Sequence, residues 1–258
     1  QRITTLYQYF KGSSDLRLPA DVPRYESLKP EDQLAFLEYK VVVRDLGNME
    51  IAQIKQVFQR INSTSYGLNT MEIHNARYGG EFKDLAEKMS ELEFFEEHKI
   101  FTATDIKRMN DVLFCAGLIA TIMSTYFNRD KEIEFFLEKY NEHFPEKEQI
   151  LNEISIVLNF ISRMNFQPKS RAFKKADFFT LFVELHSILI KEKIALDVSK
   201  TRAAIDKFFE DIETASIEGA DVGSPPDTYY RAALQASNDR GSRIERGRLV
   251  SAVIRESA

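Results

Sequence analysis

The chain has 258 residues, of which 43% are hydrophobic, so it can bury a substantial core as one large domain or two small ones. Its formal net charge of −5 argues against a protein that coats nucleic acid through bulk positive charge. The apolar run at residues 112–123 is far shorter than the ~20 residues of a membrane span, and predicts a buried helix. The single Cys115 excludes internal disulfides, and its apolar neighbours favour a core thiol. We therefore expect a folded, cytoplasmic protein without a membrane partner.

The chain begins with Gln1-Arg2-Ile3-Thr4-Thr5-Leu6, without an initiator Met and already in an amphipathic pattern that predicts a helix over residues 2–10. A proline-containing loop over residues 16–30 is expected next. Apolar and charged residues alternate over 37–46, which predicts one strand. Because a lone strand needs partners, we expect them before residue 1 or in a neighbouring chain, and expect the sequence to be a fragment of a longer protein.

The rest of the chain is predicted to be almost entirely helical. After a helix over residues 49–61, Asn69 with Glu72 three positions later forms a capping-box pattern that predicts a short helix ending near residues 78–80. Apolar periodicity then predicts a series of helices over residues 82–92, 104–127, 130–143, 146–164, 176–193, 199–217, 226–237 and 242–254.

The segment Phe58-Gln59-Arg60-Ile61-Asn62 closes one predicted helix and opens a polar loop that leads to the next. The turn between the two helices thus gathers a guanidinium, an amide and the carboxylate of Glu72. The start of a helix offers free N–H groups and a positive dipole end, which suit a phosphate. Structural roles compete with this hypothesis, because Arg60 can satisfy the last carbonyls of its helix and a capping box alone explains Glu72.

These segments resemble the N-terminal domain of GmrSD-type restriction endonucleases, a ParB/sulfiredoxin-like family of bacterial anti-phage systems. Residues 1–6 match the end of the family's Asp-Gly-Gln-Gln-Arg motif, and residues 58–62 match its Phe-x-Arg-Ile-Asn motif. The matching positions that follow are Leu68, Glu72, Asn75 and Ala76. The resemblance covers residues 1–85 and is weaker at 174–189 and 229–253, where Asn-Asp-x-x-x-Arg-Ile-x-Arg resembles the family's closing segment. The chain departs from the family at its start, where Asp-Gly-Gln-Gln is reduced to Gln1 and the preceding strand region is absent.

The resemblance implies an α+β, predominantly α fold: the remnant of a ParB/sulfiredoxin-like α/β lobe over residues 1–92, followed by a multi-helix bundle over residues 93–258. It implies a nucleoside triphosphate (GTP, ATP or CTP) bound with magnesium. The implied nucleotide-binding residues are Gln1, Arg2, Thr4, Arg60, Asn62 and Asn75. The implied magnesium ligands are Glu72 and Asn62.

The resemblance also implies a function. The chain would be a nucleotide-binding, NTP-hydrolysing sensor or regulatory module of a modification-dependent, type IV-like restriction system. A nuclease domain or subunit would be its partner, and the module could form a homo-oligomer. The four histidines stand singly, without the spacing of a metal site, so no nuclease is expected in this chain: His74, His98, His143 and His186.

Two other functions remain open. Residues 229–258 carry six arginines and three acidic residues, which favours a DNA-binding module. Several arginines of this segment are spaced so that they could share one side of a helix, as a DNA-phosphate surface or simply as a solvated face: Arg240, Arg243, Arg246 and Arg248. A helical scaffold for protein partners is the third hypothesis.

Overall fold

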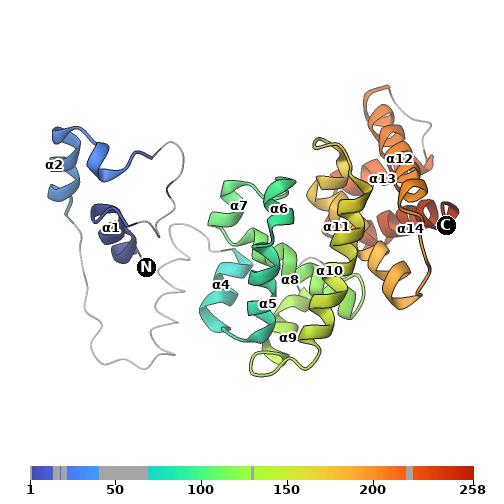
Figure 1. Cartoon of the computed structure of the whole chain (residues 1–258), viewed down its shortest axis with the longest axis horizontal. Helices are drawn as coiled ribbons and strands as arrows, with labels where there is room; N and C mark the ends of the chain where they lie inside the picture. The colour runs from blue at the N-terminus through green and yellow to red at the C-terminus, as the bar shows by residue number, and fades with distance from the viewer. Residues whose placement is uncertain (1, 14–17, 19–21, 41–68, 129–130, 219–222) are drawn as a thin grey trace. The chain divides into compact units, whose positions relative to one another are not determined.

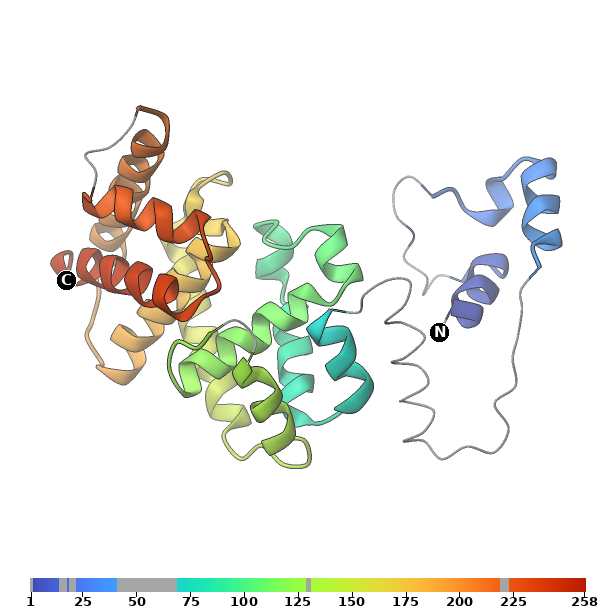
Figure 2. The ribbon, with the colours of Figure 1, turned by 180° about the vertical axis from the view of Figure 1, so that it is seen from behind.

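The computed structural model describes residues 2–13, 18, 22–40, 69–128, 131–218 and 223–258. The chain divides into two compact units, residues 1–54 and 55–258. The described residues are predominantly helical and include no strand (Figures 1 and 2). This confirms the mostly helical class and gives no support to an α/β lobe. None of the described helices has the length and apolar character needed to cross a membrane.

The described residues of the first unit form the helices α1 (Arg2–Phe10) and α2 (Pro30–Glu38) and a 3₁₀ turn at Tyr25–Ser27. Helix α1 has the predicted bounds, and Gly12, with a φ of 63°, turns the chain after it. Three aromatic rings hold these segments together: the Tyr9 ring lies 6.1 Å from that of Tyr25 and 5.4 Å from that of Phe36. Neither α2 nor the 3₁₀ turn contains a buried residue, so these two elements contribute no fully buried side chain.

The prediction of a strand over residues 37–46 is wrong at its beginning, because Leu37 and Glu38 are the last two residues of α2. Pro30 at the first helical position, with Glu31 and Asp32 in the first turn, favours a helix start that carries the chain past the expected strand start. Residues 41–46 and the predicted helix over 49–61 lie outside the described residues.

The second unit is a helical assembly, coloured from cyan to red in Figure 1. Its α-helices are α4 (Thr70–Arg77), α5 (Glu81–Ser90), α6 (Glu93–Glu97), α7 (Ala103–Lys107), α8 (Asn110–Met123), α9 (Lys131–Lys139), α10 (Lys147–Met164), α11 (Lys175–His186), α12 (Val198–Glu218), α13 (Pro225–Leu234) and α14 (Arg240–Glu256). Helices α4 and α5 pack against α8. The domain boundary expected after residue 92 therefore falls inside this unit.

Two predicted helices are interrupted. The single helix expected over residues 104–127 is divided into α7 and α8 at Met109, whose φ of 54° is in the left-handed region. The helix expected over 176–193 is α-helical only to His186, and a π-helical turn follows at Ser187–Lys191. Helix α6 was not expected at all.

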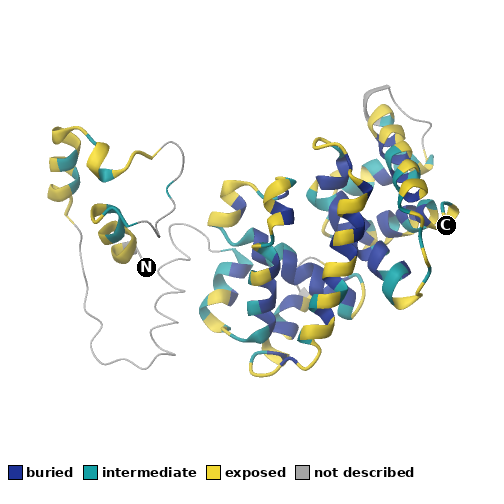
Figure 3. Ribbon diagram, viewed as in Figure 1, coloured by how far each residue is buried: buried dark blue, intermediate teal, exposed yellow. Residues whose placement is uncertain are grey.

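Helices α8 and α11 supply much of the core of this unit, and Figure 3 shows their buried residues. Helix α8 packs against α5, α7, α9 and α11, while α11 also contacts α10 and α14. Cys115 on α8 is fully buried, as expected for a core thiol, and burial raises its pKa well above the usual value. The neighbouring Phe114 is in aromatic contact with Phe178 and Phe179 of α11.

Two buried helical glycines are predicted to respond oppositely to substitution by alanine. A Cβ on Gly117 of α8 would meet its nearest neighbour, Phe179, at an ordinary 3.6 Å, so Gly117→Ala should raise the free energy of unfolding by ~0.5–1 kcal/mol. A Cβ on Gly247 of α14 would lie 2.5 Å from Oε1 of Glu184 and 2.9 Å from the Tyr126 hydroxyl, so Gly247→Ala should be destabilising. Urea unfolding of both variants measures the difference, and equal effects would contradict it.

Candidate functional site

Helix α4 begins at the capping box that the sequence predicts. Oδ1 of Asn69 accepts the N–H of Glu72 at 2.8 Å, and Oε2 of Glu72 accepts the N–H of Asn69 at 2.8 Å. The guanidinium of Arg108 lies 3.1 Å from the same Oε2 atom. The capping role of Glu72 is therefore confirmed. Its role as a magnesium ligand stays a prediction, and a cation at Oε2 would have to displace Arg108.

The remaining predicted nucleotide-binding residues are divided between the two units and the part of the chain outside the described residues. Thr4 is exposed on α1 in the first unit, and Arg2 belongs to the same helix. Asn75 is exposed on α4 in the second unit. Three of the predicted residues lie outside the described part of the chain: Gln1, Arg60 and Asn62.

The four arginines of α14 do not share one face. Arg240 and Arg248 are exposed, whereas Arg243 and Arg246 are only 5% and 1% exposed. Residues three apart lie on the same side of a helix, and the side that carries Arg243 and Arg246 packs inward, where α14 meets α11. The expected solvated arginine face is wrong for these two residues, and they cannot contribute to a DNA-contacting surface in this arrangement.

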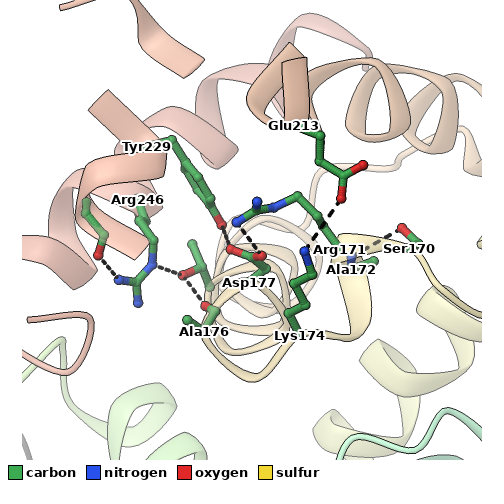
Figure 4. Close-up of polar contacts among 11 residues, drawn as sticks. Ser170, Arg171, Ala172, Lys174, Ala176, Asp177, Glu213, Tyr229 and Arg246 are labelled. Carbon is green, nitrogen blue, oxygen red and sulfur yellow. Dashed lines mark hydrogen bonds and ion pairs between the residues drawn. The ribbon is translucent and has the colours of Figure 1, made fainter. Parts of the chain in front are cut away.

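A buried ion pair lies where α11 meets the segments around it (Figure 4). Asp177 of α11 is 1% exposed, and its carboxylate accepts the Tyr229 hydroxyl at 2.9 Å and faces the Arg171 guanidinium at 2.9 Å. Burial raises the pKa of Asp177, and the positive charge of Arg171 opposes that rise. Asp177 thus joins α13, which carries Tyr229, to the start of α11.

Arg246 continues this network towards α14. Its Nε donates to Oγ1 of Thr180 at 3.1 Å, and its Nη1 donates to the carbonyl oxygens of Ala232 and Ser237 at 2.7 and 3.0 Å. Burial lowers the pKa of Arg246, while Tyr229 and other acidic groups nearby oppose the shift. One guanidinium therefore ties α14 to α11, to the last turn of α13 at Ala232 and to Ser237 in the segment that joins α13 to α14.

Arg246 also lines a cavity of about 380 Å³ bordered by α8, α11 and α14, which we call the cationic cavity. Its charged lining consists of Asp105, Lys175, Arg243 and Arg246. Three of these four side chains are basic. Further lining comes from polar side chains of α8 and of the loop before α14, and from apolar residues of α8, α9 and α11.

The carboxylate in this lining is held by its own contacts. Asp105 caps α7 in a capping box with Thr102, and its Oδ1 lies 2.5 Å from Nζ of Lys175. Burial raises the pKa of Asp105, but hydrogen bonds from Lys175 and Thr102 outweigh burial, so the pKa lies below its usual value. Asp105 is thus an ionised partner of Lys175.

Arg243 is fixed between two aromatic rings. Its guanidinium carbon lies 5.1 Å from the ring centre of Phe127 and 4.7 Å from that of Phe179, and Nη1 donates to the Phe127 carbonyl at 3.3 Å. These cation–π contacts stabilise the charge of the buried guanidinium and fix its position at the cavity.

The cationic cavity is linked to the capping box of α4. The side-chain amide of Asn69 donates to Oδ1 of Asn110 at 2.9 Å and also to the Arg108 carbonyl. Asn110 is the first residue of α8 and lines the cavity. A single hydrogen bond, from Asn69 to Asn110, therefore joins the start of α4, the helix that carries Glu72 and Ala76, to the lining of the cavity.

The sequence did not predict this cavity, although two of its lining residues were named as candidates for a different surface. Arg243 and Arg246 were singled out as surface residues, and Lys175, Asp105 and Asn110 were not singled out at all. A usable signal was present. Asn238, Arg243 and Arg246 stand in the Asn-Asp-x-x-x-Arg-Ile-x-Arg segment and Lys175 in residues 174–189, so the two weaker segments of the resemblance meet at one cavity.

Comparison with known proteins adds no relative. No family model matches the sequence, and no curated protein or solved structure shows a significant match. Within the part of the chain that the structure describes, no group of three or more His, Cys, Asp or Glu side chains could hold a metal ion. The resemblance to the GmrSD-type domain therefore rests on the motifs alone.

The Asp177 network predicts different effects for two adjacent tyrosines. Tyr229→Phe removes a donor from a buried carboxylate and should lower the free energy of unfolding by ~1–3 kcal/mol. Tyr230 is half-buried and outside the network, so Tyr230→Phe should change it by no more than ~0.5 kcal/mol. Chemical unfolding of both variants measures the difference, and a neutral Tyr229→Phe would contradict the stabilising role of this hydrogen bond.

Proposed function

We propose that this chain is a nucleotide-binding regulatory module of a modification-dependent restriction system, which binds and hydrolyses a nucleoside triphosphate with magnesium. The observation that carries the proposal is the pair of motifs at residues 1–6 and 58–62, which resemble those of the GmrSD-type N-terminal domain. The start of α4 at Asn69 supports it, because the segment with Glu72 and Asn75 then lies in the first turns of a helix. That setting favours an anion.

In this proposal the two motifs form one pocket within a ParB-like lobe. Arg60 neutralises phosphate charge, and Asn62 lies beside the phosphates and the magnesium ion. Glu72 completes the metal site after exchanging Arg108 for the cation. The other nucleotide contacts come from Gln1, Arg2, Thr4 and Asn75.

Nucleotide binding would then alter the packing of the helical unit and license a nuclease domain or subunit that cleaves modified DNA. The module would act in the cytoplasm and could assemble as a homo-oligomer. Direct DNA binding by α14 is less well supported, because only Arg240 and Arg248 of its four proposed arginines are exposed. The nitrogen Nη2 of Arg248 also lies 2.7 Å from Glu245.

The proposal predicts that the full-length protein binds at least one of ATP, GTP and CTP in the presence of magnesium, as measured by calorimetry. Arg60→Ala should weaken that binding by at least about tenfold, since a charge-assisted contact contributes ~1.5–3 kcal/mol. Arg77→Ala is the matched control. Arg77 lies on α4, and its side chain forms an exposed ion pair with Glu134 of α9 at 3.0 Å. It should leave binding unchanged.

Two results would count against the proposal. One is a folded protein that binds none of the three triphosphates. The other is equal weakening by Arg60→Ala and Arg77→Ala, which would indicate a general loss of positive charge rather than a phosphate contact.

A further inference from the structure

We propose that the cationic cavity is a second ligand site, separate from the Arg60 motif, and that it binds the phosphate group of a small phosphorylated molecule. The inference rests on the cavity bordered by α8, α11 and α14 and on the side chains that line it. It does not depend on the triphosphate site, because none of the described residues predicted for that site lines this cavity.

The charge of the lining selects the class of ligand. Lys175, Arg243 and Arg246 face the cavity with one carboxylate, that of Asp105, which leaves an excess of two positive charges. The chain as a whole has a net charge of −5, so this concentration of cations is local. A phosphate monoester carries about −1.5 to −2 charges at neutral pH and matches this excess better than a carboxylate does.

The two arginines are preorganised. Arg246 is fixed by three hydrogen bonds to Thr180, Ala232 and Ser237, and Arg243 lies against the rings of Phe127 and Phe179. Side chains that are already ordered lose little further entropy when a ligand binds. A guanidinium group is also well suited to phosphate, because its N–H groups form charge-assisted hydrogen bonds with phosphate oxygens.

Lys175 supplies an adjustable cation. Its side chain is 41% exposed, and its Nζ lies 2.5 Å from Asp105. Because the side chain is not deeply buried, its flexible stem can turn towards a ligand. The polar side chains of Asn110, Ser237 and Asn238 add hydrogen-bonding groups to the lining.

The rest of the lining fits the organic part of such a molecule. Leu113, Phe114 and Ile133 contribute apolar surface to the lining. The volume of about 380 Å³ lies within the ~300–1,000 Å³ range of small-molecule sites. A phosphate ester with a compact organic group is therefore the class of ligand that the cavity fits.

Calorimetry with inorganic phosphate, AMP and adenosine tests the site on the full-length protein. The titrations are run in EDTA, so that magnesium-dependent triphosphate binding does not contribute. We expect phosphate and AMP to bind and adenosine to bind at least tenfold more weakly than AMP. Adenosine that binds as well as AMP would overturn the proposal, and so would a folded protein that binds neither phosphate nor AMP at millimolar concentration.

Two adjacent lysines provide a matched pair of variants. Lys175→Gln removes a cation from the cavity and should weaken AMP binding at least tenfold. Lys174→Gln removes an exposed neighbour that pairs with Glu213 at 3.6 Å and does not line the cavity, so binding should be unchanged. Equal weakening by both variants would overturn the site.

A third variant guards against local disruption by Lys175→Gln. Asn238 is exposed in the loop before α14, so Asn238→Asp should fold normally while placing a repelling carboxylate in the lining. It should also weaken AMP binding at least tenfold, with an unchanged melting temperature. Arg60→Ala separates the two sites: it should leave AMP binding intact even where triphosphate binding is lost. Loss of AMP binding in Arg60→Ala would assign the phosphate to the motif site and overturn a second one.

Discussion

The arrangement of α11, α13 and α14 depends on one constraint: charged groups that are taken out of water must find partners there. Asp177 is almost fully buried, and without Arg171 and Tyr229 its carboxylate would be very costly to keep in the core. Buried ion pairs add little net stability compared with apolar packing, but they tolerate few arrangements. The pair therefore specifies how the carboxyl-terminal helices lie on α11 more than it stabilises the unit.

Arg246 connects this constraint to the cationic cavity. The same guanidinium donates hydrogen bonds to Thr180 of α11 and to the Ser237 carbonyl in the segment after α13. It also forms part of the cavity wall. The next residue is Gly247, where a Cβ would lie 2.5 Å from Oε1 of Glu184 and 2.9 Å from Tyr126, so these two side chains lie directly against the α14 backbone. The close approach that satisfies the buried charges thus also sets where the α14 side of the cavity lies.

Periodicity and capping patterns predicted the elements whose causes are local. Helix α1 has the expected bounds, α10 differs from expectation by one residue, and Asn69 caps α4 as its spacing with Glu72 indicates. The break at Met109 could not be predicted, because the residue with the left-handed backbone is a methionine and not the glycine that usually adopts this conformation. Packing beyond the local sequence imposes it.

The cavity was hidden from the sequence for a related reason. Arginine is rarely buried, so an arginine-rich helix is read as a solvated one, and only the tertiary partners of Arg243 and Arg246 reverse that reading. Lys175 looks like any lysine at a helix start until α7 brings Asp105 to it. Sequence spacing gives the face of a helix but not which other helix that face meets, and the cavity exists only through that meeting.

The contacts at the cavity also connect its lining to helix α4. Asn110 lines the cavity and accepts a hydrogen bond from Asn69, while Arg108, two residues earlier, holds the Glu72 carboxylate. A ligand that moves Asn110 would lengthen this hydrogen bond at the start of α4. If a ligand of the cavity changes the affinity of Glu72 for a cation, then by linkage that cation changes the affinity of the cavity for its ligand by the same factor. The hydrogen bond between Asn69 and Asn110 and the contact of Arg108 with Glu72 are the groups through which the two proposed sites would be coupled, and both contacts lie at the start of one helix.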